Sequence, residues 1–105
     1  MTDKQFDDAF TAAGGWFLLT QYEEIANWVG RKSDLVEYMY SKNFDKNRTG
    51  TNTRVSSVIR IIENGRGHEA LLKIRDSRTI NRQHSEAYSL SSEMLSRLFG
   101  NANQQ

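Results

Sequence analysis

Glycine placement is the feature of this 105-residue sequence that most limits how it can fold. Most of the seven glycines come just after a segment in which apolar residues recur at helical spacing. A glycine at that position is typical of a helix end, because glycine adopts the left-handed backbone conformation without a steric penalty. Proline, which would break the interior of a helix, is absent from the chain. The sequence therefore predicts an all-α protein built from short helices.

We expect four or five short helices around one core, in a single compact domain over residues 1–100. The first helix is expected over residues 3–13, where Phe6 and Phe10 lie four positions apart. The apolar run at residues 16–19 is too short to assign by periodicity, and we expect it at the centre of the core. Residues 101–105 are polar and are expected to form a disordered tail.

The fourth helix is the one that the sequence predicts most clearly, and we expect it at the centre of the domain together with residues 16–19. Its apolar residues recur at i, i+3, i+4 and i+7, which is typical of a helix face packed against a core: Val55, Val58, Ile59 and Ile62. Thr51 or Thr53 is expected to begin this helix and Gly65 to end it. The polar residues 41–53 before it are expected to form a loop, and residues 78–84 a turn.

Residues at about 21–42 resemble the helix-turn-helix motif of bacterial and phage proteins. Thr20 and Glu23 have the capping-box spacing that would begin the first helix, and Ser33 is the expected cap of the second. Ala26 provides the small side chain needed where two helices cross, and Gly30 the turn. The residues expected to face inward are Ile25, Val29, Val36 and Met39.

Two features depart from that motif. Arg31 follows the turn glycine, where the motif usually has an apolar residue. The second helix would also expose Asp34 and Glu37, and carboxylates facing a phosphate backbone oppose binding. The pattern therefore indicates a packed pair of helices more strongly than a DNA-recognition helix.

Charge is unevenly distributed along the chain, although the net charge is only +1. Residues 1–40 hold 3 basic and 7 acidic residues, whereas residues 41–82 hold 10 basic and 4 acidic residues. A basic segment rich in arginine predicts a surface that binds nucleic-acid phosphates. The predicted DNA-contacting residues are Arg31, Lys32, Ser33, Lys46, Arg48, Arg54, Arg60 and Arg66. The alternative is internal pairing, in which these cations neutralise Asp7, Asp8, Glu23 or Glu24.

Other kinds of site have little support in the sequence. His68 and His84 are the only histidines, cysteine is absent, and no metal-ligand spacing is present. Residues 45–50 begin like a calcium-binding loop, but Ser56 occupies the position that requires a bidentate glutamate. No nucleophile motif or phosphate-binding glycine loop is found. We therefore expect neither an enzyme nor a cofactor.

The sequence predicts a small, non-enzymatic binding protein, with DNA as the leading partner and a bacterial or phage regulatory setting. The alternative is a protein-interaction module, such as an inhibitor, antitoxin-like regulator or adaptor, that binds a protein partner or forms a homodimer. Its aromatic residues would then be the anchors and the charged residues the rim. The absence of cysteine, of a signal peptide and of a membrane-spanning run leads us to expect a cytoplasmic protein.

Overall fold

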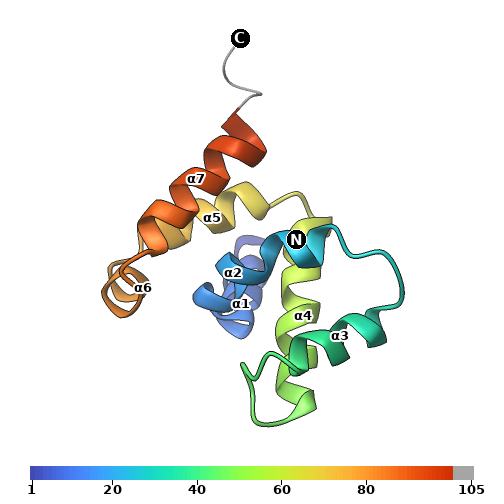
Figure 1. The fold of residues 1–105 in the computed structure, drawn as a ribbon. Coiled ribbons are helices and arrows are strands. Elements are labelled where there is room, and N and C mark those ends of the chain that lie inside the picture. The colour runs from blue at the N-terminus through green and yellow to red at the C-terminus, as the bar shows by residue number, and fades with distance from the viewer. Residues whose placement is uncertain (101–105) are drawn as a thin grey trace.

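The computed structural model describes residues 1–100, and every regular element in that part of the chain is a helix (Figure 1). The seven helices are α1 (Asp3–Ala13), α2 (Gly15–Ala26), α3 (Lys32–Tyr40), α4 (Arg48–Glu63), α5 (Gly67–Arg75), α6 (Arg78–Gln83) and α7 (Ala87–Phe99). The predicted all-α class is confirmed, with seven helices in place of four or five. The tail expected at 101–105 lies outside the described residues.

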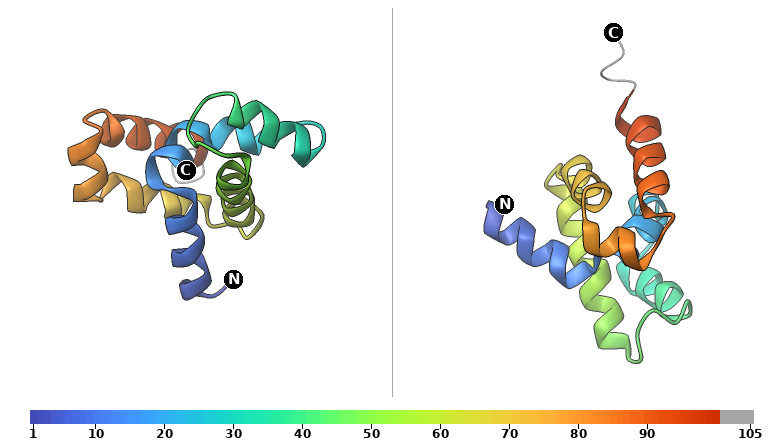
Figure 2. Two further views of the ribbon diagram at one scale, coloured as in Figure 1. Left: turned by 90° about the horizontal axis from the view of Figure 1, so that it is seen from below. Right: turned by 90° about the vertical axis from the view of Figure 1, so that its left-hand side faces the viewer.

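Helix α4 is the centre of the fold, as predicted, and it packs against α1, α2, α3 and α5 (Figures 1 and 2). Val55 and Val58 of the predicted stripe are fully buried, whereas Ile59 and Ile62 are only half-buried. Ile61, on the other side of the stripe, is fully buried instead. Because α4 has neighbours on several sides, its buried face is wider than one stripe and is rotated from the predicted position.

Helix α2 supplies the other part of the core. Phe17, Leu18 and Leu19 are buried, which confirms the central position expected of this run. Trp16 is half-buried, and its ring stacks on that of His84 with the centroids 4.0 Å apart. Helix α7 closes this side of the molecule by packing on α5 and α2 (Figure 1). None of the helices in residues 1–100 is long and apolar enough to cross a membrane.

The start of α2 differs from the prediction. A capping box at Thr20 and Glu23 is wrong, because the helix already begins at Gly15. The Thr20 hydroxyl donates instead to the carbonyl of Trp16, 2.9 Å away and one turn earlier in the same helix. Gly14, with φ of +80°, provides the sharp change of direction between α1 and α2. The predicted first helix, residues 3–13, has the expected bounds.

Helices α3 and α4 also begin earlier than predicted. Ser33 lies inside α3 and is not its cap. In α4 the cap is Asn47, whose side-chain oxygen accepts a hydrogen bond from the amide of Gly50 at 2.8 Å. The predicted caps Thr51 and Thr53 are therefore wrong, and the loop before α4 is shorter than the predicted one.

The C-terminal part differs at two places. The turn predicted at 78–84 is wrong, because α6 forms there and Ser77 caps it by accepting from the amide of Ile80 at 3.2 Å. The helical spacing of apolar residues in 85–99 predicts that Leu90 and Leu98 face inward, but in α7 they are 40% and 38% exposed. The apolar residues of α7 extend around more of the helix than its neighbours α5 and α2 cover.

Candidate functional site

Four of the eight predicted DNA-contacting residues form ion pairs within the chain. Lys32, Lys46 and Arg60 have no ion-pair partner within residues 1–100, and Ser33 is exposed on α3. A paired cation has to release its carboxylate before it can bind a phosphate, which weakens the predicted DNA surface. The pairs are Arg31–Asp34, Arg48–Glu37, Arg54–Asp45, Arg66–Asp3 and Arg66–Glu69.

Arg54 connects distant parts of the chain. Its Nε donates to the two carboxylate oxygens of Asp45 at 2.9 and 3.1 Å. Its Nη1 donates to the carbonyl of Ala13 at 2.7 Å, at the end of α1. The guanidinium also lies 5.8 Å from the ring centroid of Phe17. Arg54 therefore joins α4 to the α1–α2 junction and to the loop before α4.

Two of the four acidic residues named by the internal-pairing alternative pair with cations of the basic segment, residues 41–82. Asp7 pairs with Lys73 at 3.0 Å and Glu24 with Lys42 at 2.5 Å. Hydrogen bonds from Lys42, and secondly from Tyr38, lower the pKa of the Glu24 carboxyl below its usual value. The other two acidic residues of that alternative pair with cations outside the basic segment: Glu23 with Arg97, and Asp8 with Lys4.

The helix-turn-helix prediction is wrong at two of its key positions. Ala26 is exposed at the end of α2, and Val29 is 94% exposed in the connection over residues 27–31. The reason is that α2 begins and ends earlier than predicted, which leaves Val29 outside the helix. Both α2 and α3 pack mainly against α4. The close contact predicted between α2 and α3 is therefore replaced by contacts of each helix with α4. The other predicted inward residues, Ile25, Val36 and Met39, are buried.

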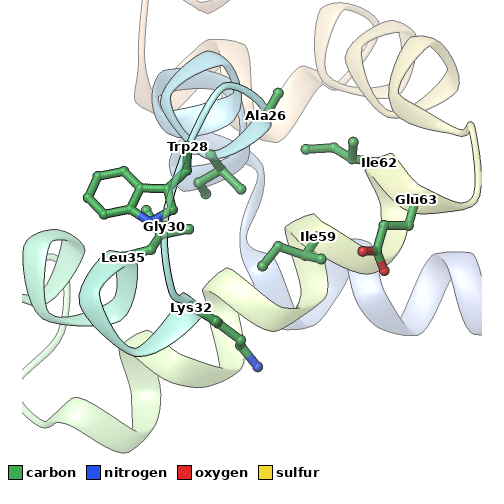
Figure 3. A pocket seen from close by; sticks show the side chains of 9 residues that line it. Ala26, Trp28, Gly30, Lys32, Leu35, Ile59, Ile62 and Glu63 are labelled. Atoms are coloured by element: carbon green, nitrogen blue, oxygen red, sulfur yellow. The ribbon is translucent and has the colours of Figure 1, made fainter.

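This arrangement leaves a groove between the end of α2, the 27–31 connection, the start of α3 and the second half of α4 (Figure 3). It encloses about 310 Å³ and is open to solvent. Ile59 and Ile62 of α4 lie on one side and Trp28 on the other, with Lys32 and Glu63 at the edge (Figure 3). We call this feature the α2–α4 groove, and its lining residues are Ile25, Ala26, Trp28, Gly30, Lys32, Leu35, Ile59, Ile62 and Glu63.

Local contacts hold the wall of the groove in place. The indole Nε1 of Trp28 donates to the carbonyl of Arg31 at 3.2 Å, across the connection. Its ring stacks on Tyr38 with centroids 5.8 Å apart and the planes 19° from parallel. Gly30 has φ of +133°, a conformation that other residues rarely adopt. Trp28 and Gly30 therefore set the path of the connection, and this path leaves Ile59 and Ile62 of α4 uncovered.

Lys32 and Glu63, the two charged residues that line the groove, differ from most charged residues of the chain in their ion pairing. Eleven of the 13 Asp and Glu side chains form ion pairs. Glu63 is one of the two that have no such partner within residues 1–100, and Lys32 has none either. The groove thus combines an apolar floor with one available charge of each sign at its edge, which are the features of a surface that binds an apolar side chain.

The apolar pattern of the sequence does not predict this groove. The pattern places Val29 on a buried helix face, and Ile59 and Ile62 in the closed core. The available signal is the apolar pair Trp28–Val29 directly before Gly30 and the polar residues 31–34. An apolar pair at a helix end is equally compatible with a buried helix terminus, so only the path of the connection reveals the exposed position.

Comparisons of the chain with models of protein families, with curated proteins and with solved structures found no match. Within residues 1–100, no three His, Cys, Asp or Glu side chains gather in a way that could hold a metal ion. We therefore infer the function from the residues and geometry of this chain.

Proposed function

We propose that the protein is a non-enzymatic protein-interaction module that binds an apolar side chain of a partner in the α2–α4 groove. The observation that carries this proposal is the groove itself, an open apolar surface on the central helix, with Ile59 and Ile62 half-buried in its floor. Continuous apolar surface left in water is typical of interaction sites. Trp28 at the edge is the residue type most often found among the energetic centres of interfaces.

Replacing Ala26 by Trp tests this proposal. Ala26 is exposed and lines the groove, so a large side chain there fills the groove without disturbing the core. We expect peptides selected from a random display library to carry an apolar anchor and to bind the wild-type chain with micromolar affinity. Ala26→Trp should weaken that binding by roughly a hundredfold, because the anchor loses its place. Isothermal titration with the selected peptides measures the loss.

Ser89→Trp is the matched control, because it adds the same side chain at an exposed position of α7, away from the groove. Circular dichroism and thermal unfolding should show both variants folded. Selected peptides that bind both variants as well as the wild type would show that the groove is not the binding site and would contradict the proposal.

DNA binding is the second candidate, and it is supported by Lys32, Lys46 and Arg60, which have no carboxylate partner among the described residues. Lys32 and Ser33 begin α3, where the predicted recognition helix would meet a groove of the duplex. Even together with Arg78 and Arg82, which also have no ion-pair partner within residues 1–100, these cations give a weak attraction to a polyanion, because the net charge of the chain is only +1. The protein-interaction proposal is therefore the stronger one.

Fluorescence anisotropy with a labelled random duplex decides between the two candidates. We expect no micromolar binding at about 50 mM salt, because Arg31, Arg48 and Arg66 keep their carboxylate partners. Micromolar binding that falls by roughly tenfold or more at about 200 mM salt would instead support DNA as the partner. In that case Lys46→Ala and Arg60→Ala together should flatten the salt dependence.

A further inference from the structure

We infer that the occupant of the α2–α4 groove is a second copy of this chain, with Val29 of each copy seated in the groove of the other. This inference rests on the proposed function, since it names the partner of the same site. It combines three observations: an exposed apolar side chain, an apolar hollow beside it, and two opposite charges at the edge of that hollow that have no ion-pair partner within residues 1–100.

Val29 is the most exposed of the large apolar side chains among the described residues, at 94%, compared with 57% for Tyr88. It belongs to the 27–31 connection, which itself forms one wall of the groove through Trp28 and Gly30. Val29 does not line the groove itself, but it is exposed between Trp28 and Gly30, two residues that do. An exposed projection beside a hollow of matching chemistry is what a two-fold symmetric interface needs, because each copy offers both parts.

The charges fit the same arrangement. Lys32 and Glu63 both line the groove, and neither has an ion-pair partner in the part of the chain that the structure describes. In a two-fold contact, Lys32 of one copy meets Glu63 of the other, and the reverse pair forms at the same time. One surface thus supplies its own complementary charges.

A second copy also fits the overall charge of the chain. A net charge of +1 produces little repulsion between two copies. A strongly acidic or basic partner would find only one charge of opposite sign to pair with at this edge, and would be repelled by the other. The edge of the groove has one positive and one negative charge, which favours a partner that also presents one charge of each sign.

Sedimentation equilibrium of the full chain tests the inference. We expect a monomer–dimer equilibrium with a dissociation constant on the order of 10–100 µM, the range of a small interface. Val29→Glu should raise that constant by roughly a hundredfold, because two apolar contacts are lost and two charges face apolar hollows. Val29 is exposed in the monomer, so this variant should fold normally. Tyr88→Glu, an exposed apolar residue on α7, should leave the constant unchanged.

The charge pair has its own test. Lys32→Glu and Glu63→Lys, each alone, should weaken self-association by roughly tenfold, because each places like charges opposite each other twice. An equimolar mixture of the two variants should recover wild-type association, because every contact is then between unlike charges. A mixture that associates no better than its separate components would overturn the proposed pairing.

A wild-type chain that remains monomeric at about 1 mM, or a dimer unaffected by Val29→Glu, would overturn the inference. These results are distinguishable from failure of the proposed function. If the chain is monomeric while selected peptides bind the wild type and not Ala26→Trp, the groove binds a different protein and only the second copy is excluded. If the chain is monomeric and Ala26→Trp changes no peptide binding, both the proposed function and the inference fail.

Discussion

Replacing Gly67 by Ala is expected to lower the free energy of unfolding by about 3 kcal/mol, the upper part of the range for overpacked cores. Gly67 is buried at the start of α5, against the side chain of Tyr22 from α2. A Cβ atom at Gly67 would lie 1.9 Å from the Tyr22 hydroxyl oxygen and 2.8 Å from Cζ. The tyrosine ring is buried, and burial raises the pKa of its hydroxyl. The whole ring therefore has to move within a closed core.

Urea unfolding of a double-mutant cycle with Tyr22→Phe measures this effect. Removing the hydroxyl deletes the nearest atom but leaves Cζ at 2.8 Å, so we expect Gly67→Ala to cost roughly half as much in the Tyr22→Phe background. Gly65→Ala is the control, because no atom lies within 4 Å of its Cβ position and its cost, about 1 kcal/mol, comes from φ of +70°. The cost at Gly65 should be the same in both backgrounds. Equal costs for Gly67→Ala in the two backgrounds would show that contact with Tyr22 is not the cause.

Helix boundaries that are determined by residues close in the sequence could be predicted from local signals. The span 3–13 and the end of α4 before Gly65 follow from apolar spacing and from a glycine with positive φ. The start of α2 could not be predicted in this way, because the apolar run at residues 16–19 after Gly15 is too short to show a helical period and Gly15 is fitted against Ile80 from α6. A Cβ atom at Gly15 would lie 2.2 Å from the Ile80 side chain, a constraint visible only in three dimensions.

The candidate site was less predictable than the fold for a related reason. Composition shows a basic segment, but only the structure shows that Arg48 pairs with Glu37 from α3 and Arg66 with Asp3 from α1. The exposed position of Val29 depends on where α2 ends and on how α2 and α3 both pack on α4. Pairing between distant residues and the path of a short connection are both tertiary properties, and neither has a periodic signal in the sequence.

Arg54→Ala is expected to lower the free energy of unfolding by about 2–3 kcal/mol, even though Arg54 was predicted to contact DNA. The substitution leaves Asp45 without its cation while the Asp45 side chain is only 14% exposed. The carbonyl of Ala13 also loses its donor, and the loop before α4 loses its connection to the α1–α2 junction. Breaking one side of a half-buried pair costs more than the pair contributes, because the remaining charge has no partner.

Thermal and urea unfolding distinguish this structural role from a surface role. Arg60→Ala, at an exposed position of the same helix, should change stability by less than about 0.5 kcal/mol. Arg54→Ala combined with Asp45→Asn should recover part of the loss, because the second change removes the unpaired charge that the first creates. Arg54→Lys should be intermediate, since an ammonium group keeps the charge but cannot donate to Asp45 and Ala13 with the fixed geometry of a guanidinium. A stability change for Arg54→Ala as small as that for Arg60→Ala would show that the contacts to Asp45 and Ala13 do not hold the loop.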